Sequence, residues 1–505
     1  MVDGLNMATL TVAKYGSGNN FGALSLDTPA ITGKKFHTGY YYALVPLNVK
    51  TLSAAVNSTA TTLPISGGTS IYSSSGGVVW IDNERITYTG KTSNSLTGCT
   101  RGTNATAAAS HVISSYVKFY QFNLNTNSNY TTARSEINTH VGLRGCLPRY
   151  SWRNLEIAEG VYDFTEPDAI LADMKDASIM TNGLKRMCLL IELRTTDAEE
   201  YVVPDYVIAH RSANPALDSE SGQFQFKGTN NPNTNGWYPR LWNTYTRNRF
   251  ILFLQALAAH YDLDDNFEMF QLSETALGNA MGTAAAGAGT QQPSGFDAVP
   301  SYYRNIDVAG TYGYFDGLRD SVLALNTAAP NTITCQLLNY DRPTIKAMIP
   351  PLVAAGVGLG CPNSLEDEPG LHTTGATPGI FGHFQTYKNV VPICPAIQKP
   401  EMFYSNLTWD LTNYTTGIDN LGNAPSGGTV PNPTFDTLAT FLKDPLYQSN
   451  YIFVTRIEFA NGTSNVTGNA FKDDFLTFLN QSPQNVAGGG LNATQPSKYS
   501  SVITA

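Results

Sequence analysis

Two short stretches of this chain place acidic and aromatic residues where a buried strand is expected to end. Glu274 follows the apolar run FEMFQL, with only Ser273 between them, and a Gly- and Ala-rich segment comes next. The stretch Arg149–Phe164 follows the apolar run VGLRGCL and contains a Trp, two arginines and two glutamates. A positioned carboxyl group donates or accepts protons, and an indole ring offers a flat apolar face. These residue types suit acid–base cleavage of a glycosidic bond.

The second stretch also carries a recognisable pattern, W-x-x-L-E-x-x-x-G-x-Y-D-F. It runs from Trp152 through Glu156 and Gly160 to Phe164. The pattern resembles the retaining beta-galactosidase and cellulase clan of barrel glycosidases, and Glu274 downstream strengthens the resemblance. The resemblance spans roughly residues 36–479 at low overall similarity, apart from an inserted segment. It implies a barrel whose active site lies at the C-terminal ends of the strands.

The scaffold is predicted from this resemblance together with the alternation of apolar runs and helical segments. We expect an α/β fold, a (β/α)8 TIM-type barrel with an inserted small antiparallel β domain. The clearest helix, at residues 242–261, has Phe250, Phe253, Leu254 and Leu257 at helical spacing. Other helices are expected at residues 131–140, 166–177, 312–325, 344–355 and 473–479. The expected strands are residues 36–46, 141–146, 187–193, 267–272, 332–338, 357–361, 390–396 and 451–457.

The sequence pattern of residues 51–117 differs from that of the rest of the chain. Short alternating runs lie between Gly, Asn and Ser turns, which is typical of a small β module. The phrases ERITYTG and LTGCTRG resemble small modules of bacteriophage tail and baseplate proteins. The predicted organisation is an N-terminal arm or attachment segment (1–35), a barrel (36–50 and 118–480) holding this module, and a C-terminal arm (481–505).

Composition narrows the function classes. Charged residues make up 14% of the chain and the net charge is −9, which argues against nucleic acid because phosphate binding needs a basic face. No apolar run approaches the ~20 residues of a membrane span, and no secretory signal opens the sequence. The six widely spaced cysteines favour buried free thiols. The seven scattered histidines predict no metal site, and we expect no cofactor.

The resemblance implies catalytic roles for two carboxylates. Glu274 matches the acid/base residue that ends the fourth strand, although Ser273 stands where the clan usually has Asn. The nucleophile should follow the seventh strand, where the sequence aligns either Gln398, which cannot do this chemistry, or Glu401. We assign Glu401 as the second acid and keep an inverting pair as an alternative. Other acids that could serve are Glu366, Asp367, Glu368 and Glu458.

Five further residues are candidates for substrate binding. Glu192 lies within a strand, so it either pairs with a nearby arginine such as Arg149 or contacts a sugar hydroxyl. Trp152 and Trp409 are candidate stacking platforms, and Asp341 is a candidate sugar contact or simply a turn residue before a proline. Arg149 completes the predicted set. We expect Glu156 to organise a turn and to do no chemistry.

The first functional hypothesis is a tail-associated protein of a phage virion, exposed to the outside, that binds and possibly cleaves host surface polysaccharide. The alternative is a non-catalytic receptor-binding, structural, baseplate or decoration protein on a degenerate glycosidase scaffold. A cellular glycosidase is a weaker option. The expected partners are host cell-surface polysaccharide, other virion proteins and further copies of the chain, because virion appendages are commonly homo-oligomers.

Overall fold

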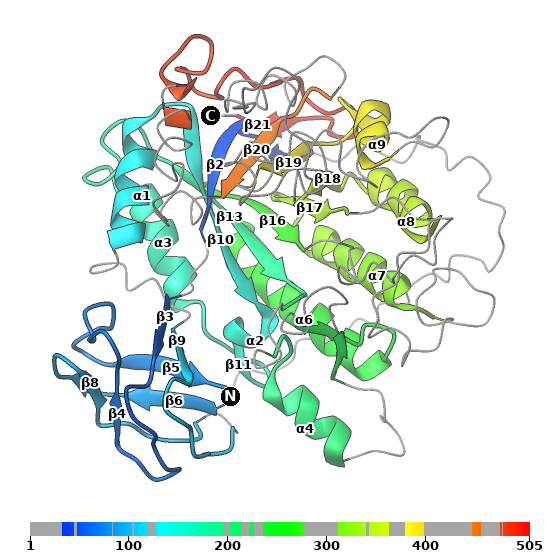
Figure 1. The fold of residues 1–505 in the computed structure, drawn as a ribbon. Coiled ribbons are helices and arrows are strands. Elements are labelled where there is room, and N and C mark those ends of the chain that lie inside the picture. Colours follow the sequence, from blue (N-terminus) through cyan, green and yellow to red (C-terminus); the bar gives the residue numbers. More distant parts are fainter. Residues whose placement is uncertain are drawn as a thin grey trace, which may run out of the picture.

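The structure is a computed structural model, and a closed barrel with a small β module beside it dominates the fold (Figure 1). The residues that the structure describes are 33–44, 48–82, 84–103, 106–119, 128–195, 201–213, 222–226, 236–273, 275, 312–339, 343–362, 379–397, 447–455, 475–476 and 478–504.

Eight parallel strands close the barrel in the order β10-β13-β16-β17-β18-β19-β20-β2. Each strand overlaps one of the predicted ranges, so the expected (β/α)8 TIM-type fold is confirmed. The strands read as almost continuous apolar runs because both of their faces are covered. Their bounds are β2 Gly39–Leu44, β10 Leu143–Ser151, β13 Arg186–Glu192, β16 Phe267–Leu272, β17 Ile333–Leu337, β18 Gly358–Cys361, β19 Ile393–Ile397 and β20 Tyr451–Thr455.

Helices surround the barrel. The longest described helix, α6 (Thr244–Tyr261), begins where the Asn243 side chain accepts a hydrogen bond from Thr246 N, and it buries the predicted Phe and Leu face. No helix among the residues described here is both long and apolar enough to cross a membrane. The other helices are α1 Ser128–Thr139, α2 Trp152–Leu155, α3 Thr165–Lys175, α4 Asp205–Ala213, α7 Tyr314–Ala328, α8 Pro343–Ala354 and α9 Ile380–Tyr387.

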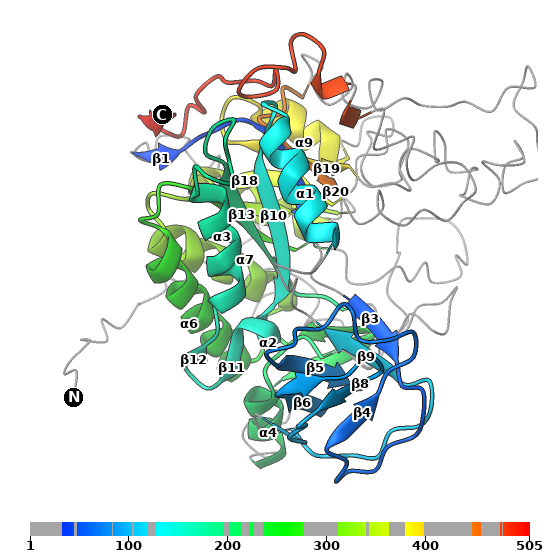
Figure 2. The same cartoon turned by 90° about the vertical axis from the view of Figure 1, so that its left-hand side faces the viewer.

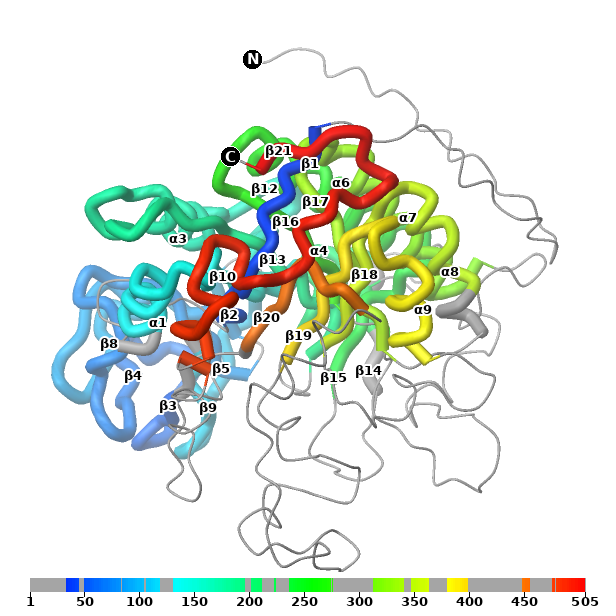
Figure 3. Tube along the Cα trace, turned by 90° about the horizontal axis from the view of Figure 1, so that it is seen from above, coloured from blue at the N-terminus to red at the C-terminus, as the bar shows by residue number. Residues whose placement is uncertain are grey.

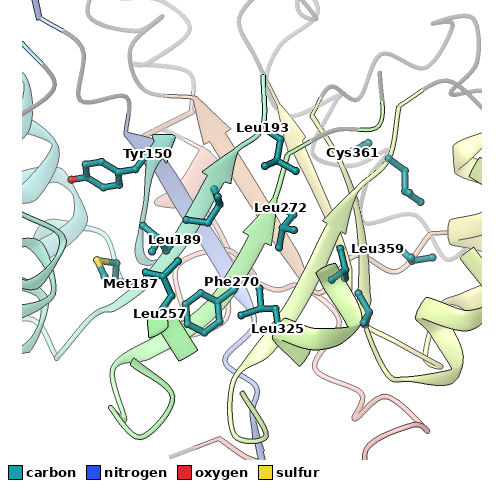
Figure 4. Packing of buried hydrophobic residues seen from close by; sticks show 14 of the residues in the cluster. Tyr150, Met187, Leu189, Leu193, Leu257, Phe270, Leu272, Leu325, Leu359 and Cys361 are labelled. Carbon is teal, nitrogen blue, oxygen red and sulfur yellow. The ribbon is translucent and has the colours of Figure 1, made fainter. Parts of the chain in front are cut away.

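The core has two layers, because side chains alternate between the inside of the barrel and the helices. In β13, Cys188 and Leu190 belong to the inner cluster, whereas Leu189 belongs to the outer one. Figure 4 shows part of the outer layer, where Phe270 of β16 lies in the same cluster as Leu257 of α6. All six cysteines are buried and none forms a disulfide, as predicted.

The β module has two antiparallel sheets and its own apolar core. His111 joins its turns, because its Nδ1 lies 2.7 Å from an Asp82 carboxylate oxygen and its Nε2 lies 2.8 Å from a Glu84 oxygen. Arg101 donates two hydrogen bonds to Glu84 from the other side. The strands are β3 Asn48–Thr51, β9 Tyr116–Phe119, β5 Gly77–Ile81 and β6 Glu84–Tyr88 in one sheet, and β4 Thr62–Pro64, β8 Ser95–Thr97 and β7 Gly90–Lys91 in the other.

The C-terminal segment, predicted as an arm at 481–505, packs against the barrel over its described residues. Strand β21 (Val502–Ile503) pairs in parallel with β1 (Lys34–Lys35). Tyr499 is 1% exposed in the cluster inside the barrel, and its hydroxyl donates to Gly356 O at 2.8 Å. Figure 3 shows the segment crossing one end of the barrel. Its Gly- and Ser-rich composition hid the few side chains that hold it in place.

Replacing Tyr499 with alanine should lower the free energy of unfolding by about 3–5 kcal/mol, because a large aromatic side chain leaves a cavity in a closed barrel. Urea unfolding followed by tryptophan fluorescence would measure the change. Ser497→Ala, two residues away and exposed, is the matched control and should change stability by less than about 0.5 kcal/mol. Equal stability of the two variants would contradict this account of the segment.

Candidate functional site

The C-terminal ends of the strands form the barrel mouth, the face on which (β/α)8 barrels carry their sites. Leu147 of β10 and Leu190 of β13 lie in the inner cluster. Because strand side chains alternate, Arg149 and Glu192, two residues further along, project on the same inner side at the mouth. Strands β10 and β13 are direct neighbours, so these two side chains meet.

Arg149 and Glu192 form a hydrogen-bonded ion pair from Nη2 to Oε1. Their side chains are 27% and 28% exposed, so the pair is reachable from the mouth. The Arg149 Nε is buried and has no hydrogen-bond partner among the described residues. The predicted pairing of Glu192 with an arginine is therefore present, and the pair also keeps polar atoms within reach of a ligand.

The residues on either side of Glu274 are held by neighbouring strands. The Ser273 hydroxyl accepts a hydrogen bond from Leu193 N at 2.8 Å, next to the end of β13. The Thr275 hydroxyl donates to Asn339 O at 2.9 Å and accepts from Asn339 N at 3.0 Å, just beyond β17. Glu274 itself lies outside the described residues. Sequence reasoning missed the contribution of Thr275, because its partner lies 64 residues away in the chain.

Several predicted site residues also lie outside the described part of the chain. They are Glu401, Trp409 and Asp341, together with the alternative residues Glu366, Asp367, Glu368, Gln398 and Glu458. Their roles stay predictions. Among the described residues, no group of three His, Cys, Asp or Glu side chains is arranged to hold a metal ion.

Trp152 is not a stacking platform, so that prediction is wrong. Its side chain is 0% exposed, and its ring packs against Phe250 and Phe253 of α6 with centroids 5.2 and 6.2 Å away. The indole Nε1 donates to Glu156 at 2.6 Å. A platform needs an open ring face, and both the ring and its polar atom are committed to the core.

Glu156 organises the turn after β10, as predicted. Besides Trp152, its carboxylate accepts hydrogen bonds from Gly160 N at 2.8 Å, the Tyr206 hydroxyl at 2.9 Å and Arg249 at 2.8 Å. Gly160 has a φ of 69°, a conformation that favours glycine. The W-x-x-L-E-x-x-x-G pattern therefore describes a folded turn that joins α2, α4 and α6.

Comparisons with known proteins give fold-level likenesses at most. No protein-family model matches the chain, and no curated protein sequence does. Among solved structures, it is similar to a glycosylated endo-beta-1,4-xylanase of glycoside hydrolase family 10 from Gloeophyllum trabeum (11% identity, 65% of this chain, 80% of that chain, TM-score 0.32). It is also similar to a family 39 glycoside hydrolase from Bacteroides cellulosilyticus WH2 (9% identity, 83% of this chain, 75% of that chain, TM-score 0.34). A third similar structure is endo-glycoceramidase II from Rhodococcus sp. (11% identity, 65% of this chain, 68% of that chain, TM-score 0.33).

The class of the protein follows from its own strand order, which defines a (β/α)8 barrel with an added β module. Unrelated functions share this fold, so function must be argued from the site.

Proposed function

We propose that the barrel mouth binds a polysaccharide and hydrolyses its glycosidic bonds, with Glu274 as the general acid. The observation that carries this proposal is the anchoring of Ser273 and Thr275 to the neighbouring strands at the end of β16. A proton donor must be held in a fixed place, and both chain neighbours of Glu274 are fixed. The partly open Arg149–Glu192 pair supplies donors and acceptors for sugar hydroxyls.

In this proposal Glu274 protonates the leaving glycosidic oxygen, and Glu401 supplies the second carboxylate. At a separation of about 5–5.5 Å from Glu274 it would attack the sugar directly, and at about 6.5–9.5 Å it would activate water. Trp409 and Asp341 are proposed sugar contacts. No metal ion or cofactor enters the scheme.

We further propose that the glycan is a host surface polysaccharide and that the chain is an oligomeric, tail-associated part of a phage virion. The support is the resemblance of residues 51–117 to phage tail modules and the low charge content of 14%. A second candidate is a binder that has lost catalysis. It is favoured by Gln398, and by Ser273, whose hydroxyl is already committed to the β13 side of the barrel.

The test is release of reducing ends from a panel of purified bacterial capsular polysaccharides and O-antigens, with binding measured on the same panel. Release by the wild type that Glu274→Gln abolishes would support the hydrolase. Binding without release by either protein would refute hydrolysis and favour the binder. Neither release nor binding would refute both and leave a structural role.

Arg149→Met should raise KM by about tenfold or more and change kcat less, because the partly open pair contributes mainly to binding. Glu192→Gln keeps the size of its side chain but loses the charge, and we expect a smaller rise in KM. Initial rates on the polysaccharide that the panel identifies would measure both. An unchanged KM in both variants would remove the pair from the proposed site.

A further inference from the structure

An open pocket lies between the β module and the segment that joins β10 to α3. The module contributes Val78, Trp80 and Arg85, from β5 and β6. The barrel side contributes Asn154, Asp163 and several neighbours. Figure 2 shows β5 and β6 beside α2 and β11 (Glu156–Ala158). The pocket is outside the barrel, so it is distinct from the mouth.

Three polar side chains in this pocket each have one group that is hydrogen-bonded within the protein and another group that no described residue contacts by a hydrogen bond. Arg85 donates from Nη1 to the Thr103 hydroxyl at 3.0 Å and forms no ion pair with any described residue. Asn154 accepts from Ser151 N at 3.1 Å and from its hydroxyl at 2.7 Å, which leaves the amide NH2 group without a described partner.

Asp163 completes the set. Its Oδ1 accepts from Thr165 N at 3.1 Å at the start of α3, and its other oxygen has no described partner. Burial lowers the pKa of Arg85, while Asp163 and Asp205 act on it only through space and raise it. The pocket therefore presents two fixed donors and one fixed acceptor with hydrogen-bonding capacity that no described residue uses.

The boundary between the β module and the barrel, which we call the seam, is held by side-chain interactions that fix the walls of the pocket. The Arg153 guanidinium lies 4.0 Å from the centre of the Trp80 ring and pairs with Asp205 at 2.7 Å. On the barrel side, the Tyr150 hydroxyl donates to Glu166 at 2.7 Å. Arg153 therefore links the module to the barrel, and the pocket is already formed in the absence of a ligand.

We propose that this pocket binds a neutral sugar unit. Donors and acceptors set near one another suit the paired hydroxyls of a sugar, and the side chains of Val78, Trp80 and Ile157 supply the apolar surface that its C–H face needs. Two arginines and two carboxylates line the pocket, so its formal charges cancel and do not favour an ionic ligand.

The pocket adds a second point of contact to the glycan-binding function proposed above, and in that respect it rests on that function. A glycan held at the seam and at the mouth would gain affinity through the second attachment without any new chemistry. The two sites differ in their residues, so variants can separate them.

The test is affinity gel electrophoresis of the full chain in gels that contain dextran, xylan, mannan or galactan, with polygalacturonate as the acidic comparison. Every protein carries Glu274→Gln, so cleavage does not alter the gel. Arg85→Met removes the open donors, and Ile157→Trp fills the pocket from β11. Lys50→Met, on β3 of the same module but outside the pocket, is the matched control. Thermal melting confirms that each variant is folded.

We expect retention by at least one neutral polysaccharide, with affinity about tenfold weaker in Arg85→Met and in Ile157→Trp and unchanged in Lys50→Met. Retention that neither pocket variant reduces, retention by polygalacturonate alone, or no retention by any gel would overturn the proposal. Reducing-end release by the wild-type chain is measured separately. Loss of that activity with seam binding intact would refute the proposed hydrolase and leave this site standing.

Discussion

Replacing Glu274 with glutamine should lower the rate of polysaccharide hydrolysis by about 100- to 10,000-fold, the usual contribution of a positioned general acid. Glutamine keeps the size and shape of the side chain, but its amide group cannot act as a general acid. Affinity for the polysaccharide should therefore change by less than about threefold. Ser273 and Thr275, on either side of the substituted residue, should keep their hydrogen bonds to the neighbouring strands.

The role of Glu274 as general acid is tested most directly by comparing substrates whose leaving groups differ in their need for protonation. A dinitrophenyl glycoside departs without protonation, so its kcat/KM should fall far less in Glu274→Gln than that of an unactivated glycoside. Glu159→Gln is the matched control, because Glu159 is 58% exposed on the turn after β11 (Glu156–Ala158) and lies outside the mouth. Equal losses for both substrates would contradict a role as general acid.

The barrel could be predicted from the sequence because its strands are buried on both faces. Runs such as FEMFQL at β16 and MCLLIEL at β13 are apolar nearly throughout, which is the pattern of a parallel strand under helices. Helix α6 was equally clear, since its buried residues recur at helical spacing. Local pattern and tertiary burial agree in these elements.

Other features depend on contacts between residues that are far apart in the chain. The C-terminal segment is held by Tyr499 and by pairing of β21 with β1, and neither leaves a periodic signal. Helices α4 and α9 are short, at 9 and 8 residues, and were not predicted. The seam pocket needs β5, β6 and α3 together, which no local pattern reveals.

The prediction of the site failed where residues of types that are common in active sites have a structural role instead. Trp152 and Glu156 have the residue types of a sugar cleft, yet they hydrogen-bond to each other inside a turn. The spacing of Glu156 to Gly160 was the available clue, because the carboxylate accepts the hydrogen bond of a backbone N–H four residues on. Arg149 and Glu192 form the ion pair that the sequence offered as one alternative, and their role in binding a substrate stays a prediction.

At the opposite end of the barrel from the mouth, Glu268 is a fully buried carboxylate that should dominate the pH dependence of stability. It accepts hydrogen bonds from His37 N at 2.7 Å and from the Tyr451 hydroxyl at 2.6 Å, and His37 Nδ1 lies 2.8 Å from its second oxygen. Arg186 is 3.8 Å away. Burial alone would raise the pKa of Glu268, but His37, Arg186 and Tyr451 together lower it to about 2.

We therefore expect Glu268→Gln to destabilise the barrel by about 3–5 kcal/mol at pH 7, because it removes a buried negative charge that lies near Arg186 and accepts hydrogen bonds from His37 and Tyr451. The lowered pKa stabilises the folded chain above pH 4.5, and this stability is lost as the pH falls from 4.5 toward 2. The wild type should lose stability across that window, and the difference between the two proteins should shrink there. Urea unfolding at several pH values would measure it.

Glu192→Gln is the matched control, because Glu192 occupies the inner face of the same barrel at the mouth and is 28% exposed. Water screens its charge, so we expect this substitution to cost less than about 1 kcal/mol, with little dependence on pH. A cost for Glu192→Gln equal to that for Glu268→Gln would mean that burial is not what distinguishes the two carboxylates. A Glu268→Gln protein that follows the wild-type pH curve would mean that the Glu268 charge does not hold this end of the barrel together.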